Sequence, residues 1–179
     1  MIAGIGVLGS LDASHAAFMD FAINANGAKE VNSAGVPNQG DPDGSAIGTL
    51  RLDNGTGSGT TGSASFTLTL NNLDVGTFNL TGHHIHQAPS TTTGSIVLDF
   101  GDPDAIRTGN ILSGTITGLS AATITSIFAN PAGFYYNVHN SQFTGGAVRD
   151  QLVAVPEPGA IAFLGLGGLG GLIARRRRG

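Results

Sequence analysis

Histidine is the residue type in this chain that is best suited to metal chemistry, and four of its five histidines lie in two short segments. These four are His83, His84, His86 and His139. Side chains two positions apart in a β-strand point to the same face, with their Cα atoms about 6.5–7 Å apart. His84 and His86 are therefore expected to converge, while Ile85 between them points the other way.

His139 can join this pair if the two segments form neighbouring strands. It follows Val138, which we expect to face the core together with Ile85. The imidazoles of His84, His86 and His139 would then share the outer face of one sheet. Because imidazole nitrogen is a good ligand for copper and zinc, the sequence predicts a candidate Cu or Zn site at these three residues.

This arrangement is similar to the copper site of Cu/Zn superoxide dismutase, where an H-x-H strand and a later Val-His pair supply ligands on the outside of a β-barrel. The further histidine ligands of that enzyme have no counterpart, because His83 faces away by parity and His15 lies in a predicted leader. We therefore do not expect dismutase activity. The alternative interpretation is structural, with the histidines bonded to neighbouring strands and loops through Asn137, Gln87 and Asn140.

Other motifs do not complete a known site. The segment from Asp41 begins like a calcium loop, but Ala46 and Leu52 stand where such a loop needs Gly and Glu. Residues 165–170 fit the G-x-G-x-x-G dinucleotide pattern without the preceding strand that the pattern requires. The sequence also has no cysteine and no G-x-S-x-G elbow. We therefore expect no catalytic residue and no organic cofactor.

Charge is distributed unevenly along the chain. Four of the eight basic residues are the arginines 175–178, and of the twelve acidic residues only Glu157 lies beyond residue 155. The acidic body has no positive surface for a phosphate backbone, which excludes nucleic acid as a partner. Arg149 is expected to fix a strand end through a carboxylate such as Glu30 or Asp150.

The composition, with 29 glycines among 179 residues, disfavours long helices. Period-two alternation predicts eight or nine short strands. The candidates are Phe18–Ala25, Ala46–Asp53, Ser63–Asn71, Phe78–Thr81, His83–Gln87, Ser95–Phe100, Ile111–Thr117, Tyr135–Asn140 and Val148–Val153. One short helix is predicted from Ser120 as N-cap to Ala129, ended by Asn130-Pro131. The fold class is therefore all-β, an antiparallel β-sandwich or flattened barrel of immunoglobulin-like or superoxide-dismutase-like type.

The N-terminal end is apolar in a way that the middle is not. Residues 2–11 carry no charge, and Ser14-x-Ala16 supplies the small residues that signal peptidase prefers. Residues 1–16 are therefore predicted to be a truncated signal peptide. The alternative is an N-terminal segment that frays from the body.

The C-terminal end has three parts. Val155-Pro156-Glu157-Pro158 interrupts regular structure, residues 159–174 are uncharged and mainly apolar, and the arginine run follows. A helix of that apolar length spans roughly 24 Å, slightly less than a hydrocarbon core of about 30 Å. Arginines directly after it would hold that end on the cytoplasmic side, so the segment is predicted to be a transmembrane helix. The alternative is a buried C-terminal helix of the domain, which would normally be amphipathic rather than apolar all round.

This order of parts over residues 155–179 resembles the PEP-CTERM sorting signal of Gram-negative bacteria. The residues that carry the resemblance are Pro156, Glu157, Pro158, Arg175, Arg176, Arg177 and Arg178. The resemblance implies transit through the inner membrane, recognition by an exosortase and removal of the apolar tail at or near Pro-Glu-Pro.

The middle of the chain, residues 17–154, resembles the CHRD domain. The landmarks, in order, are GAKEV from Gly27, GSAIGTL from Gly44, GHHIHQAP from Gly82, GSIVL from Gly94, NPAGFYYNVHN from Asn130 and GGAVRDQL from Gly145. Two positions depart from the family pattern, with Ala147 where Glu is common and Asp150 where Gly is common. The resemblance implies a secreted β-sandwich module without a defined reaction.

Taken together, these features predict an exported, non-enzymatic CHRD-type module that exosortase delivers to the cell envelope or extracellular matrix. Its role would be adhesive or matrix-associated, with an extracellular polysaccharide or matrix as partner. Recognition of a polysaccharide by stacking would need exposed aromatic rings, and the chain has two Tyr and no Trp. The alternative is a histidine-based Cu or Zn protein of the envelope.

Overall fold

The computed structural model describes residues 18–55, 61–73 and 79–156, and most of this part of the chain is β-structure. Its strands are β1 (Phe18–Asn26), β2 (Ser45–Asp53), β3 (Thr61–Asn71), β4 (Leu80–Gln87), β5 (Ser95–Asp99), β6 (Arg107–Thr108), β7 (Ile111–Ser120), β8 (Phe134–Asn140) and β9 (Val148–Gln151). The helical elements are α1 (Ala121–Ala129) and the 3₁₀ turns η1 (Gly27–Lys29), η2 (Pro103–Ala105) and η3 (Pro131–Gly133). The strands follow the predicted alternation, since every second residue of β3 is buried.

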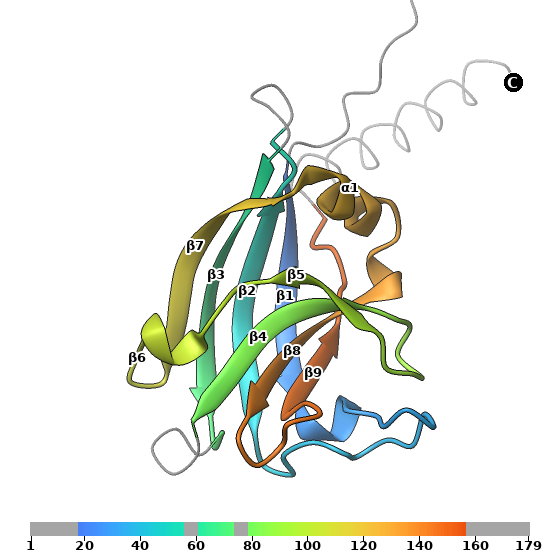
Figure 1. Cartoon of the computed structure of the whole chain (residues 1–179), viewed down its shortest axis with the longest axis vertical. Helices are drawn as coiled ribbons and strands as arrows, with labels where there is room; N and C mark the ends of the chain where they lie inside the picture. The colour runs from blue at the N-terminus through green and yellow to red at the C-terminus, as the bar shows by residue number, and fades with distance from the viewer. Residues whose placement is uncertain (1–17, 56–60, 74–78, 157–179) are drawn as a thin grey trace, which may run out of the picture.

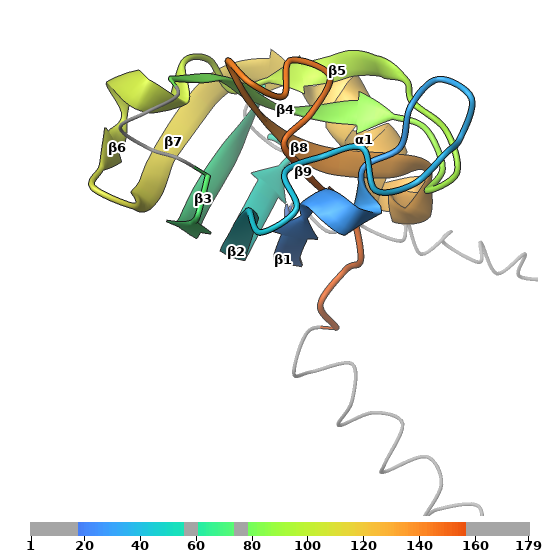
Figure 2. The same ribbon diagram turned by 90° about the horizontal axis from the view of Figure 1, so that it is seen from below.

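The nine described strands form one sheet in the order β5-β4-β8-β9-β1-β2-β3-β7-β6, and each pairing is antiparallel. In Figure 1, β7, β3, β2 and β1 run side by side while β4, β5 and β8 cross in front of them. Figure 2 shows from below how the sheet curls until its two parts face each other. The predicted antiparallel all-β fold with one short helix is confirmed, as a half-barrel made from a single curled sheet.

The hydrophobic core fills the inside of this curl. Its large members are Phe21, Ile23, Leu50, Leu52, Phe66, Leu68, Leu70, Ile85, Leu98, Phe134, Tyr136 and Val138, drawn from both parts of the sheet. Full burial of one such aliphatic side chain contributes about 1.5–3 kcal/mol. Core packing therefore determines which face of each strand points inward. The side chains that alternate with the core residues lie on the opposite face of the sheet.

The helix α1 begins and ends where the sequence predicts. The Ser120 hydroxyl accepts a hydrogen bond from the Thr123 N–H at 3.2 Å, which caps the N-terminus. Asn130 ends the helix and Pro131 follows it. Ile124 and Ile127 are fully buried, so the helix closes one end of the core.

Apart from shifts of one to three residues at strand ends, two details differ from the predicted strands. β4 is continuous where a break at Gly82 was predicted, because the glycine is accommodated by a register shift between Leu80 and Gly82 in the pairing with β8. β6 was not predicted, since its two residues, Arg107 and Thr108, are too few to show a period.

The last described residues return to the first strand. Ala154 forms a β-bridge with Phe21, and the Val155 N–H donates to the Asp20 carbonyl at 2.8 Å. The predicted signal peptide and the predicted transmembrane helix lie outside the described residues, so both stay predictions. In the described ranges, no helix has the length and apolar character needed to span a membrane.

Candidate metal centre

The three histidines predicted as ligands lie on two adjacent strands. His84 and His86 belong to β4 and His139 to β8, and the pairing of these strands places all three on one face of the sheet. Ile85 and Val138 are fully buried in the core on the other face, as parity predicts. One ligand atom from each imidazole lies within 4.8 Å of the other two.

Main-chain carbonyls orient two of the rings. His86 Nδ1 lies 2.9 Å from the Gly94 carbonyl oxygen, and His139 Nδ1 lies 3.0 Å from that of Thr144. An Nδ1–H donated to each carbonyl leaves the lone pair on Nε2. Metal-binding histidines usually bond their second nitrogen in this way, which fixes both the tautomer and the ring orientation.

The Nε2 atoms of these two rings carry the lone pairs that could bind an ion. His86 Nε2 lies 3.1 Å from His84 Nδ1. His139 Nε2 is buried, and the described residues provide it with no hydrogen-bond partner. Two nitrogens bound to one tetrahedral Zn²⁺ at 2.0–2.1 Å lie about 3.4 Å apart. The His84–His86 spacing is close to that value, and the ligand atoms of all three rings lie within 4.8 Å of one another.

Gly82 provides the space that the His84 ring occupies. A Cβ at this position would lie 2.7 Å from His84 Nε2, which is shorter than a real Cβ contact. Gly82 pairs directly with His139 in the β4–β8 register, so it lies beneath the cluster. A side chain here would push the imidazole of His84 out of its place.

Burial keeps two of these imidazoles neutral. The pKa of His84 is lowered to about 4, mainly by desolvation and to a smaller extent by the adjacent His139 and His86. The carboxylate of Asp99 on β5 raises the pKa of His84 and so opposes these effects. Desolvation also lowers the pKa of His86, with smaller contributions from His139 and Arg149 and an opposing one from the carbonyl hydrogen bond. Neutral imidazole is the form that binds metal, so near pH 7 no proton on these rings competes with an ion.

A stack of side chains supports His86. The Tyr135 ring lies parallel to the His86 ring, with centroids 4.8 Å apart and an interplanar angle of 3°. The Arg149 guanidinium carbon lies 3.4 Å from the centroid of the Tyr135 ring. Because β8 lies between β4 and β9 in the sheet, Tyr135 on β8 lies between His86 and Arg149. Arg149 donates to the carbonyls of Thr92 at 3.0 Å and Pro89 at 2.7 Å. The segment before β5 is thereby tied to the same face as the cluster.

Arg149 also meets a buried carboxylate. Its Nη1 lies 3.9 Å from Glu30 Oε1, and both side chains are almost completely buried. The Asn137 amide donates to Glu30 Oε2 at 2.5 Å. Of the two carboxylates predicted as partners of Arg149, Glu30 is therefore the one that faces it, whereas Asp150 pairs with Lys29 at 2.7 Å.

His83 points into the core, as its parity predicts. It is fully buried, with Nδ1 2.9 Å from the Tyr136 hydroxyl oxygen. Its ring centroid lies 4.9 Å from that of Phe66 and 5.4 Å from that of Phe100. Desolvation lowers the pKa of His83 to about 4, against a weaker opposing effect of Asp99. His83 is therefore a structural histidine on the face away from the cluster.

Two of the three partners predicted by the structural interpretation are bonded elsewhere. Asn137 donates to Glu30, and Asn140 Nδ2 donates to the Leu73 carbonyl at 3.5 Å. The histidines of the cluster instead use main-chain carbonyls and one another. Tyr135 could have been found from the sequence, since it has the same parity on β8 as His139. The two carbonyls could not, because they depend on loop conformation.

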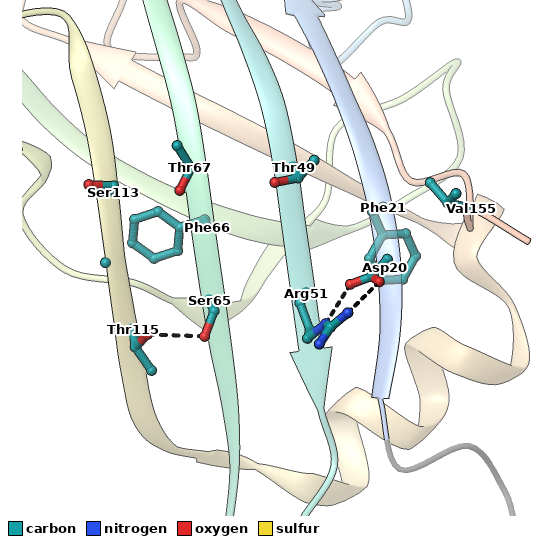
Figure 3. A pocket seen from close by; sticks show the side chains of 11 residues that line it. Asp20, Phe21, Thr49, Arg51, Ser65, Phe66, Thr67, Ser113, Thr115 and Val155 are labelled. Carbon is teal, nitrogen blue, oxygen red and sulfur yellow. Dashed lines mark hydrogen bonds and ion pairs between the residues drawn. The ribbon is translucent and has the colours of Figure 1, made fainter. Parts of the chain in front are cut away.

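A second feature lies on the solvent-facing side of the other half of the sheet. A depression of about 740 Å³ runs over β1, β2, β3 and β7 (Figure 3). Hydroxyl side chains dominate its lining, namely Thr49, Ser65, Thr67, Ser113 and Thr115. Arg51 donates to both carboxylate oxygens of Asp20 at 2.7 Å, so the charges in the depression are paired. The sequence signal for it is the Ser/Thr alternation along β3.

Comparison with known families gives two matches. A model of the CHRD domain matches residues 21–152, and a model of the PEP-CTERM protein-sorting motif matches residues 154–178. No curated protein and no solved structure matches the chain. The first range contains all three histidines of the cluster, and the second contains the Pro-Glu-Pro segment and the arginine run.

Proposed function

We propose that the body of this chain, which belongs to the CHRD-domain family and is followed by a PEP-CTERM sorting motif, is a metal-binding module. It would hold copper or zinc through His84, His86 and His139. The motif marks the chain for transit through the membrane and export to the cell envelope or extracellular space, with exosortase as the processing enzyme. The metal site is therefore proposed for a protein that acts outside the cytoplasm.

The observation that carries this proposal is the buried Nε2 of His139. It has no hydrogen-bond partner in the described part of the chain, and the centroid of the His139 ring lies 4.6 Å from that of His84 and 5.8 Å from that of His86. A buried polar atom without a partner costs about 1–3 kcal/mol. A bound metal ion removes that cost, and the carbonyl bonds of His86 and His139 hold their rings in the orientation that an ion requires.

The test is metal retention by the full chain purified in detergent. The protein is loaded with Cu or Zn, desalted and analysed for bound metal, beside a variant with His84→Ala, His86→Ala and His139→Ala. We expect about one ion per chain in the wild type and none in the variant. The matched control is His83→Phe with Tyr136→Phe, which removes a buried histidine from the same strand but from the opposite face. Equal metal content in wild type and triple variant would refute the proposal.

A second candidate is the adhesive or matrix-associated role, which the hydroxyl-lined depression of Figure 3 supports. Both tyrosines are buried, so a sugar chain bound there would be held by hydrogen bonds rather than by tyrosine stacking. The test is calorimetric titration with a soluble neutral glucan. Thr49→Val, Thr67→Val and Thr115→Val together remove hydroxyls and preserve shape, and should abolish binding. A heat signal that survives these changes would place glucan elsewhere, and no signal in wild type would exclude this ligand.

A further inference from the structure

The ligand set of the histidine cluster carries no negative charge. In the described part of the chain, the metal-ligating side chains that come together here are three imidazoles, without a carboxylate among them. Asp99 pairs with His84 across β4 and β5, but its side chain is exposed and accepts the Gly101 N–H at 2.9 Å. An ion held by three neutral imidazoles therefore keeps its whole formal charge.

Two of the three histidines are also shielded from solvent, while His139 is half-buried. His84 and His86 are each only 8% exposed. The cost of moving an ion out of water grows with the square of its charge, so a divalent ion costs about four times as much to bury as a monovalent ion of similar size. Anionic ligands normally offset this difference in buried sites. This cluster has none, so its surroundings favour the lower charge.

The nearest buried charges do not reverse this preference. The Arg149 guanidinium lies against Tyr135, one ring away from His86, and contributes positive charge. Glu30 lies 3.9 Å from Arg149 and balances it. The pair is thus close to neutral as a whole, with its positive member on the side of the histidines.

We infer that the three-histidine site selects Cu⁺ over Zn²⁺ and Cu²⁺, an inference that rests on the proposed function. Cu⁺ is a d¹⁰ ion that is satisfied by two or three imidazole ligands. Zn²⁺ in proteins usually takes four ligands, so at this cluster of three imidazoles it would need a water molecule as the fourth. Ligand number and ligand charge therefore point to the same ion. Since Cu⁺ is held more tightly than Cu²⁺, the reduction potential of the bound copper lies above that of aqueous copper.

The test measures three affinities on the full chain in detergent. Cu⁺ is titrated anaerobically against a chromophoric Cu⁺ chelator, and Zn²⁺ and Cu²⁺ are titrated against chelators of known affinity. We expect Cu⁺ to bind at least about 100-fold more tightly than Zn²⁺, which corresponds to a difference of about 2.8 kcal/mol. Voltammetry of the copper-loaded protein should give a potential above that of the aqueous couple.

Two variants separate the possible causes. His139→Ala should weaken Cu⁺ binding by about 100-fold or more, because only two imidazoles remain. Asp99→Asn should leave the Cu⁺ affinity within about twofold of wild type. A large loss of Cu⁺ affinity in Asp99→Asn would show that a carboxylate takes part, and would overturn the inference.

The two proposals fail in different ways. Zn²⁺ or Cu²⁺ bound as tightly as Cu⁺, or a copper potential at or below the aqueous value, would overturn the Cu⁺ inference and leave the proposed metal-binding function intact. No binding of any of the three ions by wild type would overturn both.

Discussion

At the scale of single residues, Gly82 tests whether the position of the His84 ring matters for metal binding. Gly82→Ala places a methyl group 2.7 Å from His84 Nε2 and displaces that ring. We expect metal affinity to fall by about 10–100-fold, as for other changes that misorient a ligand, while the fold is retained. Competition titration measures the affinity, and circular dichroism reports the fold.

Gly145→Ala is the matched control for this substitution. A Cβ at Gly145 meets no atom within 4 Å, although the residue lies next to Thr144, whose carbonyl bonds His139. Its metal affinity should equal that of wild type. Equal affinities for Gly82→Ala and Gly145→Ala would mean that the His84 ring is not held where a ligand must be.

His83 makes stability depend on pH. Its pKa is about 4 in the folded protein against 6.5 in the unfolded chain. Because the folded value is the lower one, the unfolded chain binds more protons between pH 4 and 6.5. Stability is therefore full above pH 6.5 and falls as the pH drops toward 4. We expect this residue to account for a loss of about 3 kcal/mol, measured by urea denaturation of the metal-free protein at a series of pH values.

The double variant His83→Phe with Tyr136→Phe isolates this contribution. It removes both partners of the buried hydrogen bond and keeps ring-shaped side chains beside Phe66 and Phe100. Its free energy of unfolding should fall less steeply between pH 6.5 and 4. An unchanged slope would assign the acid sensitivity to other groups.

The predictable part of the candidate site is the part that depends only on which face of a strand each residue occupies. Alternation alone put His84 and His86 on one face and His83 on the other, and the structure agrees. The convergence of His139 required β8 to lie next to β4, which period-two patterning does not specify. The stack on His86 and the buried Glu30 depend on segments distant in the chain, so no local signal indicates them.

At the scale of elements, the buried ion pair between Glu30 and Arg149 joins the segment after η1 to β9. Arg149→Met leaves the Glu30 carboxylate buried without a cation, and should lower the free energy of unfolding by about 3–5 kcal/mol. The double variant Glu30→Gln with Arg149→Met should recover most of that loss. Chemical denaturation of wild type, Glu30→Gln, Arg149→Met and the double variant gives the coupling energy. Additive effects would show that the two side chains do not interact.

The cap of α1 offers a second test at this scale. Ser120→Ala removes the hydroxyl that accepts the Thr123 N–H, and should cost about 1 kcal/mol. Ser126→Ala is the control, because the Ser126 hydroxyl bonds only back to the Ala122 carbonyl within the exposed part of the helix. Its stability should change by less than about 0.5 kcal/mol. Equal losses in both variants would contradict the capping role.

Most strands were predictable because they alternate over seven or more residues, as β1, β2, β3 and β7 do. The break predicted at Gly82 was wrong. A glycine weakens an isolated strand, but β4 continues through Gly82 because it pairs with β8 there. The order of strands in the sheet was not predictable, because β4 reaches β8 across the whole β5–α1 segment. Sequence specifies which face a residue takes more directly than which strand lies beside it.

At the scale of the whole molecule, sorting depends on the segment that matches the PEP-CTERM motif. Deletion of residues 156–179 should abolish delivery to the envelope surface, because the chain then lacks the part that exosortase processes. Fractionation of cells expressing the full and shortened chains measures the outcome. A variant with Arg175–Arg178 replaced by Gln keeps the length and tests the charge rule separately. Unchanged delivery after the deletion would refute the sorting role.

The pairing of Ala154 with Phe21 brings the first and last described segments together at one end of β1. If the predicted leader and the predicted tail helix are both inserted in the membrane during export, the polypeptide leaves the bilayer and returns to it at neighbouring points. The half-barrel can then close while both anchors are still in place. Folding would then not depend on removal of either the leader or the tail. Exosortase would release a domain that is already folded.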